Sequence, residues 1–241
     1  MAAPYNAALQ PGLRMQQPPH HPTTDFAAAR NNMVDSQIRP NRVNDPRVLE
    51  AMRRLPRELF VPPHQAAIAY MDEDLPLGRG RYLVEPLVTA RLVQMARVRT
   101  GERVLVVAAG TGYGAAVMAA CDAAVTALEE DEALIAIALR ALPRLAPTVR
   151  LVDGRLAAGL PSDGPWDAIM IEGAVTAIPA AYANQLAPGG RLVTVLAPTG
   201  TSGGRAVLAE AVGSGALQAR DMFDCNTPLL PGLAPEPTFV F

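Results

Sequence analysis

From Glu102 onward, short apolar runs of strand length alternate with alanine-rich stretches of helical character. This alternation indicates a mostly parallel sheet covered on both faces, because each crossover places a helix across the sheet. Near the C-terminus, two runs flank a Gly-Ser-Gly turn at 213–215, which predicts an antiparallel hairpin. The runs expected to form strands are ERVLVVAAG, AAVTALEE, TVRLVDG, WDAIMIEG and GGRLVTVLA, followed by RAVLAEAV and ALQARDMF.

The first of these strands runs directly into a glycine-rich turn, AGTGYGA, at residues 109–115. In a doubly wound sheet this turn lies at the topological switch point, where ligands bind beyond the carboxyl ends of the strands. Gly110 and Gly112 permit positive backbone dihedral angles and let a ligand approach the main chain closely. The segment matches the nucleotide fingerprint GxGxxA, although tight strand-to-helix packing without a ligand produces the same pattern.

The second strand ends in LEED, with Glu129 at the distance from the glycine turn where an acid holds ribose hydroxyls. We therefore expect Glu129 to bind the ribose of an adenosine-type ligand, with Glu130 as a second candidate at the same site. The competing interpretation is a negative charge at the start of the next helix, a role that Glu130 and Asp131 fill better. NAD and S-adenosylmethionine both contain this ribose, so the turn and the acid do not choose between them.

Composition excludes several classes of chemistry. Every basic residue is arginine, which excludes Schiff-base enzymes, pyridoxal-phosphate enzymes and the P-loop lysine. Only three histidines occur, two of them in a proline-rich segment, so we expect neither a metal site nor a Ser-His-Asp triad. Cys121 and Cys225 lack CxxC spacing, as in a reducing compartment. The charges of the 21 basic and 23 acidic residues nearly cancel, which predicts no nucleic-acid partner. No apolar run is long enough to span a membrane, so we expect a cytoplasmic protein without a membrane partner.

The chain divides into three predicted parts. Residues 1–24 are polar and proline-rich, which predicts a disordered leader. Residues 25–100 predict a helical arm and a glycine-bounded extended segment, GRGRYLVEP, and residues 101–241 the sheet domain. Within the arm, Asp45 and Pro46 are typical of a helix start. We interpret the arm's arginine cluster as a solvated helix face; its members are Arg39, Arg42, Arg47, Arg53, Arg54 and Arg57.

The arm carries the most specific signal in the sequence. It reads MVDSQIRPNRVNDPRVLEAMRRLPRELFVP, then AY, then LPLGRGRYLVEP, and is followed in order by VLVVAAGTGYGAAVMA, VTALEEDEAL, PWDAIMIEGAV and QLAPGGRLV. From about Met33 to about Val195 the chain resembles the protein-L-isoaspartate O-methyltransferase family. The resemblance implies a Rossmann-like class I S-adenosylmethionine-dependent methyltransferase fold: an N-terminal helical arm and a mostly parallel sheet with an antiparallel C-terminal hairpin.

The resemblance also implies an activity and a cofactor. The enzyme would use S-adenosylmethionine to methylate the abnormal α-carboxylate of isoaspartyl residues in damaged proteins, which is a protein-repair reaction. Its partner would be a protein or peptide that carries this carboxylate, and we expect the enzyme to be a monomer. A carboxylate is ionised near neutral pH and the sulfonium methyl is already activated, so positioning can replace acid–base catalysis. Two alternatives stay open: a non-catalytic or substrate-shifted binding protein on the same scaffold, and an NAD-binding oxidoreductase supported only by the GxGxxA match.

Several residues at the implied cofactor site depart from the family pattern. Ala108 stands at the family's first glycine, and Val106 replaces the acid two residues before it. The resemblance assigns Ala108, Gly110, Thr111 and Gly112 to the cofactor turn. After the third strand, VDGRLAAG places either Asp153 or Arg155 at the family's adenine-contacting aspartate.

The residues at the implied methyl-acceptor site depart further from the family pattern. Tyr82, Leu83 and Val84 replace a Thr-Ile-Ser run whose serine belongs to the family's active site, and valine cannot form that hydrogen bond. The phenol of Tyr82 or a charge-assisted bond from Arg81 can replace the polar contact that the serine would make with the carboxylate. In the competing interpretation, Tyr82 and Val84 simply alternate around a packed β segment. We assign Tyr82, Val84 and Glu172 to the catalytic, methyl-acceptor site; a strand-end charge is the alternative role of Glu172.

Overall fold

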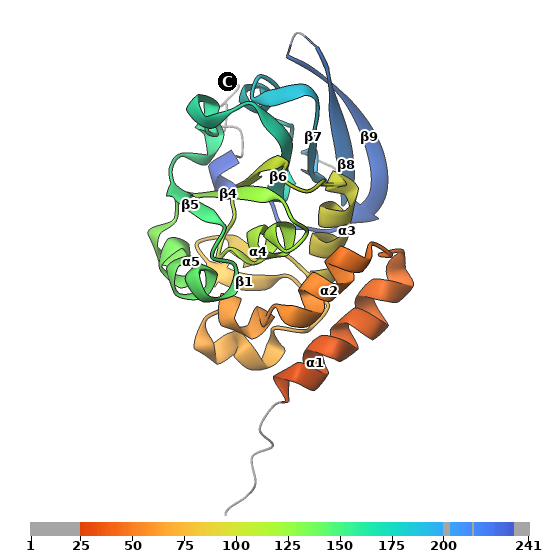
Figure 1. Ribbon diagram of the computed structural model, residues 1–241, viewed down its shortest axis with the longest axis vertical. Coiled ribbons are helices and arrows are strands. Elements are labelled where there is room, and N and C mark those ends of the chain that lie inside the picture. The colour runs from red at the N-terminus through yellow and green to blue at the C-terminus, as the bar shows by residue number, and fades with distance from the viewer. Residues whose placement is uncertain (1–24, 200–202, 214, 234–241) are drawn as a thin grey trace, which may run out of the picture.

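The computed structural model describes residues 25–199, 203–213 and 215–233, so the leader predicted over 1–24 lies outside the described residues. Seven strands form one sheet in the order β5-β4-β3-β6-β7-β8-β9 (Figure 1). All the predicted strand runs are confirmed as strands. Their bounds are β3 Arg103–Val107, β4 Ala124–Glu129, β5 Arg150–Asp153, β6 Trp166–Val175, β7 Leu186–Leu196, β8 Gly204–Gly213 and β9 Ala216–Cys225.

The sheet reverses its strand order at β3. β4 and then β5 lie on one side of β3 and β6 and β7 on the other, all paired in parallel. The turn that follows β3 therefore lies at the switch point, as predicted. β8 pairs antiparallel with both β7 and β9, which confirms the C-terminal hairpin.

Side chains of β3 alternate between two hydrophobic cores, one on each face of the sheet. Val104 and Val106 belong to the core that also contains residues of the arm, whereas Leu105 and Val107 belong to the core on the opposite face. The helices between the sheet strands are α4 Tyr113–Ala119, α5 Glu132–Leu145 and α6 Ala180–Ala183, with short turns η5 Leu156–Ala158, η6 Pro161–Asp163 and η7 Pro231–Leu233.

The arm folds as helices and turns that pack against the first core, below the sheet in Figure 1. Asp45 caps α2, where its Oδ1 accepts from the Arg47 N–H at 2.9 Å and Pro46 occupies the first turn, as predicted. Because arm and sheet residues share one core, the boundary at residue 100 stays a proposal. The arm comprises α1 Phe26–Asn32, η1 Met33–Ile38, η2 Arg39–Asn41, α2 Pro46–Arg54, η3 Arg57–Phe60 and η4 Pro63–Ile68, and α3 Pro86–Ala96 leads into the sheet.

One member of the arginine cluster corrects the prediction of a solvated face. Arg57 is fully buried, and its guanidinium donates to the carbonyl oxygens of Ala69 and Val84 at 2.7 and 2.8 Å. A buried arginine is stable only with such partners, because burial without hydrogen bonds is costly. Helical spacing could not show this, since Arg57 lies just after the end of α2.

A separate two-stranded hairpin joins the arm to α3. β1 spans Leu75–Gly78 and β2 spans Arg81–Leu83, in antiparallel register. Between them, Gly78, Arg79 and Gly80 all have positive φ angles, of 101°, 50° and 71°. The predicted extended segment is confirmed as β2; its partner β1 is a finding of the structure. In the described part of the chain, no helix combines the length and apolar character needed to cross a bilayer.

Candidate functional site

The glycine turn after β3 is left-handed at three positions. Ala108, Gly110 and Gly112 have φ angles of 56°, 57° and 93°. A left-handed angle is unfavourable for an L-residue with a β-carbon, so Ala108 holds a conformation that suits the glycine of the family pattern. At Gly112 a β-carbon would also approach Leu142 of α5 to 3.0 Å, so the packing of helix α5 requires this glycine too.

The Glu129 carboxylate faces the glycine turn and is fully buried at the end of β4. Its Oε2 accepts from the Gly110 N–H at 2.7 Å, and its Oε1 from the N–H groups of Glu130 and Asp131 at 2.9 and 3.0 Å. The turn and the acid, predicted from separate parts of the sequence, therefore meet. Whether they hold a ribose stays a prediction.

The Glu129 carboxylate also forms an ion pair with an arginine. Arg81 of β2 donates from Nη1 to Glu129 Oε1 at 2.6 Å and from Nη2 to Oε2 at 2.8 Å, and its Nη2 also contacts the Ala108 carbonyl oxygen at 3.2 Å. Both side chains are nearly inaccessible, at 7% and 0% exposure. A carboxylate offers about four lone-pair sites, and five donors surround this one. Arg81 therefore pairs with Glu129 and not, in this structure, with a methyl-acceptor carboxylate, the role considered for it above.

Glu172 lies on β6, beside the first turn of α4. It is 5% exposed, and a β-carbon placed on Gly114 would lie 2.5 Å from Glu172 Oε1, so the carboxyl group occupies the space that only glycine leaves free. Within the part of the chain that the structure describes, neither carboxyl oxygen has a hydrogen-bond partner. Burial raises the pKa of Glu172 to about 8, against opposing contributions from Arg57 and Arg81, so the group is protonated near neutral pH.

Further polar atoms around the turn are buried and, among the described residues, unpartnered. They are Arg57 Nη1, the Tyr113 hydroxyl, Thr111 Oγ1 and Arg81 Nε. The guanidinium of Arg57 lies 4.8 Å from the centre of the Tyr113 ring. Native interiors leave few polar atoms unsatisfied, so their concentration around one turn makes this region the candidate functional site. Sequence reasoning missed Arg57, which was grouped with the solvated arginines of the arm.

The two remaining residues of the predicted acceptor site differ in burial. Tyr82 is 37% exposed, whereas Val84 is 2% exposed and belongs to the core shared with the arm. The carbonyl oxygen of Val84 accepts from Arg57 and from the Thr89 hydroxyl, at 2.8 and 3.3 Å. Side chains two residues apart in a strand share a face, so alternation alone does not explain the difference: β2 ends at Leu83, and Val84 follows it. The catalytic roles of Tyr82, Val84 and Glu172 stay predictions.

The candidates on the ribose and adenine side are more exposed than Glu129. Glu130 Oε2 accepts from the Leu156 N–H at 3.0 Å, while Asp131 caps α5 as expected, accepting from the Ala133 N–H at 2.8 Å. Asp153 is the register partner of Glu129, and both Asp153 and Arg155 are exposed. The structure does not choose between these two for adenine.

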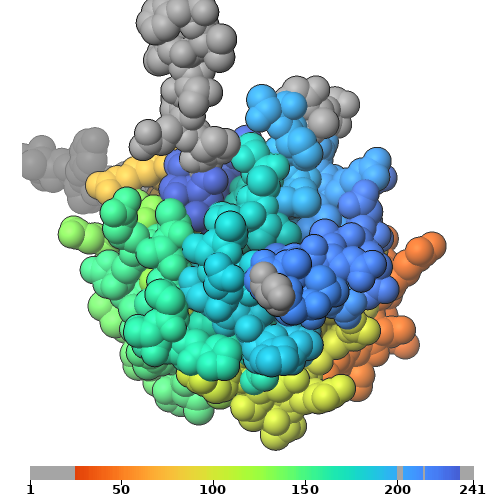
Figure 2. All heavy atoms as spheres, turned by 90° about the horizontal axis from the view of Figure 1, so that it is seen from above, coloured from red at the N-terminus to blue at the C-terminus, as the bar shows by residue number. Residues whose placement is uncertain are grey.

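The C-terminal segment 228–233 lies against β6 and beside the β1–β2 hairpin. Leu230 donates its N–H to the Ala174 carbonyl oxygen at 2.8 Å and fills the space beside Gly173, where a β-carbon would lie 2.6 Å from Leu230 Cγ. Pro231 Cγ lies 3.1 Å from the β-carbon position of Gly80 in the hairpin. Figure 2 shows the dark blue C-terminal segment beside the gold hairpin on one face of the molecule.

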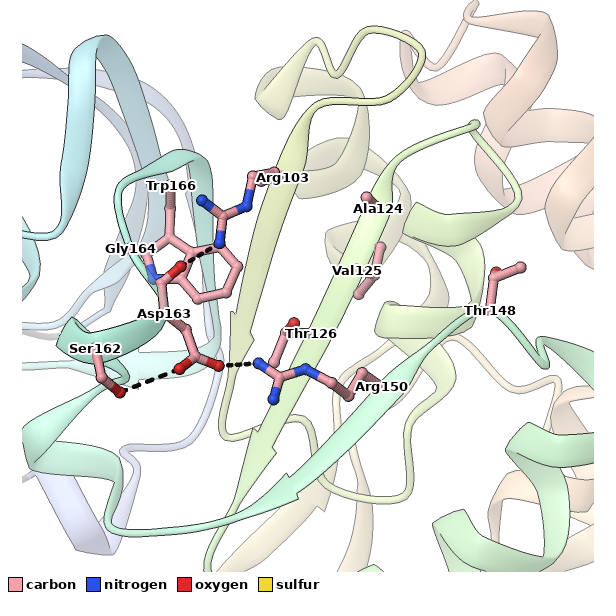
Figure 3. A pocket seen from close by; sticks show the side chains of 10 residues that line it. All are labelled: Arg103, Ala124, Val125, Thr126, Thr148, Arg150, Ser162, Asp163, Gly164 and Trp166. Atoms are coloured by element: carbon pink, nitrogen blue, oxygen red, sulfur yellow. Dashed lines mark hydrogen bonds and ion pairs between the residues drawn. The ribbon is translucent and has the colours of Figure 1, made fainter.

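An open hollow lies at the opposite, amino ends of the strands (Figure 3). Its charged side chains pair with one another: Asp163 accepts from Arg150 and, through its carbonyl, from Arg103, whose guanidinium lies 5.1 Å from the centre of the Trp166 ring. This hollow is therefore distant from the glycine turn. Among the described residues, no group of three or more His, Cys, Asp or Glu side chains is placed to hold a metal ion.

Comparison with known proteins gives consistent findings. The family model for protein-L-isoaspartate(D-aspartate) O-methyltransferase matches residues 28–218. The protein-L-isoaspartate O-methyltransferase of Methylorubrum populi is 42% identical over 181 residues, which cover 75% of this chain and 84% of that protein. A solved structure of the same name superposes with a TM-score of 0.68 at 25% identity, over 79% of this chain and 63% of that one. A Plasmodium falciparum structure, at 20% identity and a TM-score of 0.69 over 84% of this chain and 98% of that one, supports the fold.

Proposed function

The chain belongs to the protein-L-isoaspartate(D-aspartate) O-methyltransferase family, and on that premise we propose that it methylates the α-carboxylate of isoaspartyl residues in proteins or peptides, with S-adenosylmethionine as methyl donor. The family and the Rossmann-like methyltransferase fold predicted from the sequence are thereby confirmed. Family membership also decides against the nicotinamide-dependent oxidoreductase.

The residues around the glycine turn are of the types that such a cofactor needs. Gly110 leaves its β-carbon side open except for an ordinary contact with Leu77 at 3.9 Å, and the Glu129 carboxylate accepts from the Gly110 N–H beside it. Thr111 contributes a buried hydroxyl that has no partner among the described residues. We propose that Gly110, Thr111, Gly112 and Glu129 hold the cofactor, with Ala108 and Glu130 beside them and Asp153 or Arg155 near the adenine.

When bound, S-adenosylmethionine supplies an activated methyl group on a sulfonium sulfur. The acceptor carboxylate is already ionised, so no base is required, and orientation of the two reacting groups can supply the acceleration. Arg57 supports the acceptor side by holding the Val84 carbonyl, and its buried Nη1 carries the positive charge that a carboxylate requires. Glu172, protonated near neutral pH, does not repel that carboxylate.

The observation that carries this proposal is the Glu129 carboxylate turned inward, 2.7 Å from the glycine-turn N–H. The test uses an isoaspartyl peptide, its aspartyl isomer as control, and labelled S-adenosylmethionine. We expect a base-labile methyl ester on the isoaspartyl peptide only. S-adenosylhomocysteine binding without methyl transfer would favour the non-catalytic alternative, which the buried Val84 at the family's serine position supports.

We also propose that the protein acts as a cytoplasmic monomer, without nucleic-acid or membrane partners. Its nearly balanced charge supports the absence of a nucleic-acid footprint. Cys121 and Cys225 are free, and burial raises the pKa of each thiol to about 11, which suits a reducing compartment. Light scattering of the purified chain tests the monomer.

A further inference from the structure

The β1–β2 hairpin brings two cations to the two acids at the end of β4. Arg81 pairs with Glu129, and Arg79 lies 3.6 Å from Asp131. Leu77 of the same hairpin lies 3.9 Å from the β-carbon position of Gly110. The hairpin therefore lies over both the glycine turn and the acid of the proposed cofactor site.

Arg81 and a ribose require the same atoms. A ribose diol binds an acid by donating its hydroxyl protons to the carboxylate oxygens, and Arg81 donates to both oxygens of Glu129. Five donors already surround the Glu129 carboxylate, so no lone pair is left for the two hydroxyl groups of a ribose. We propose that Arg81 occupies the ribose subsite of the cofactor-free protein and acts as a gate that must release Glu129 before the nucleoside binds. This inference rests on the proposed function.

One feature of the closed state favours release. Arg81 Nε is buried without an acceptor among the described residues, so part of the guanidinium loses hydration without compensation. The bidentate ion pair with Glu129 and the hydrogen bond from Nη2 to the Ala108 carbonyl favour closure.

The hairpin is separate from the main sheet in its hydrogen bonding. It forms its own two-stranded sheet, and its turn carries three successive positive φ angles at Gly78, Arg79 and Gly80. Arg79 is 77% exposed, so its pair with Asp131 is screened by water. Leu75 and Leu83 anchor the strands of the hairpin in the core, so release of Glu129 requires a movement of the turn and of the Arg81 side chain.

Such a gate multiplies the apparent affinity by the fraction of molecules in the open state, because only the open state binds. Arg81→Gln removes the charge and the bidentate geometry but keeps a side chain that can donate to Glu129. We expect calorimetry with S-adenosylhomocysteine to give a dissociation constant about tenfold lower for Arg81→Gln than for the wild type, with Arg81→Lys in between. The matched control is Arg79→Gln, which removes the same charge from the same hairpin and should change the constant less than about twofold.

The gain must depend on the ribose hydroxyls. Adenosine should bind Arg81→Gln more tightly than the wild type, whereas 2′,3′-dideoxyadenosine should show no such gain. Hydrogen exchange adds a readout that does not depend on affinity: S-adenosylhomocysteine should increase exchange in residues 75–83 of the wild type while protecting 108–112.

The outcomes separate this inference from the function on which it rests. A lower constant for Arg81→Gln, confined to ligands with the diol, supports the gate. Equal or weaker binding by Arg81→Gln, with the wild type still binding S-adenosylhomocysteine, overturns the gate and leaves the methyltransferase proposal intact. Failure of both wild type and Arg81→Gln to bind any of the three ligands overturns both.

Discussion

The two ends of the parallel strands both carry arginine–carboxylate pairs, in opposite physical settings. At the carboxyl ends, Arg81 and Glu129 are 7% and 0% exposed. At the amino ends, Arg150 and Asp163 are 55% and 30% exposed (Figure 3). Surface pairs are screened and contribute little, whereas a buried pair is costly to break. The comparison predicts that breaking the Arg81–Glu129 pair costs far more stability than breaking the Arg150–Asp163 pair.

The largest expected effect comes from breaking the buried pair. Glu129→Ala leaves the Arg81 guanidinium and three backbone N–H groups without their acceptor, which should lower the free energy of unfolding by about 3–5 kcal/mol. It should also weaken S-adenosylhomocysteine binding by at least about 1 kcal/mol, through loss of charge-assisted bonds. Urea denaturation and calorimetry measure the two effects. A stability loss below about 1 kcal/mol would show that Arg81 relaxes into solvent, which would end the contrast between the two ends.

A second effect at the same end depends on pH. The pKa of Glu172 is raised from 4.5 to about 8 by burial, so between these values the folded protein keeps a proton that the unfolded chain has lost. Stability contributed by this proton is complete below pH 4.5 and is lost as pH rises through about 8. Glu172→Gln should therefore equal the wild type at low pH and exceed its free energy of unfolding by up to about 5 kcal/mol near pH 9.

The matched control for Glu172→Gln is Glu130→Gln, an exposed acid at the same end of the sheet. Denaturation curves at a series of pH values measure both variants. A difference between Glu172→Gln and the wild type that does not vary with pH would contradict a protonated Glu172.

A smaller effect compares the buried and the exposed candidates of the predicted acceptor site. Val84→Ser restores the family's residue type but places a hydroxyl in the core, so we expect a loss of about 2 kcal/mol. Tyr82→Phe, on the exposed face, should change stability by less than about 0.5 kcal/mol. Chemical denaturation measures both variants. An increase in methyl-transfer rate for Val84→Ser would place its side chain at the acceptor after all.

The smallest effect is expected at the amino ends. Arg150→Gln breaks an exposed pair with Asp163, so the free energy of unfolding should stay within experimental error of the wild type, most clearly at high salt. A large loss of stability in the same urea titration would show that the hollow of Figure 3 is a structural site.

Periodicity, glycine positions and helix caps suffice to predict the fold. The apolar runs are long enough and regular enough for each strand of the main sheet, and Asp45, Pro46 and Asp131 mark helix starts through local chemistry. The meeting of Gly110 with Glu129 was also predictable, because consecutive parallel strands end at the same edge of a sheet. β1 was missed, since four residues with a proline carry too little periodic signal.

Contacts between distant segments were decided only by the tertiary structure. The alternation at Arg81–Leu83 showed that neighbouring side chains face opposite ways, but not that Arg81 would meet an acid 48 residues away. Arg57 looked like its solvated neighbours, and only the fold wraps carbonyls from two later segments around it. Local sequence determines backbone conformation because its causes lie within a few residues, whereas the partner of a buried charge depends on which segments the sheet and its two cores bring together.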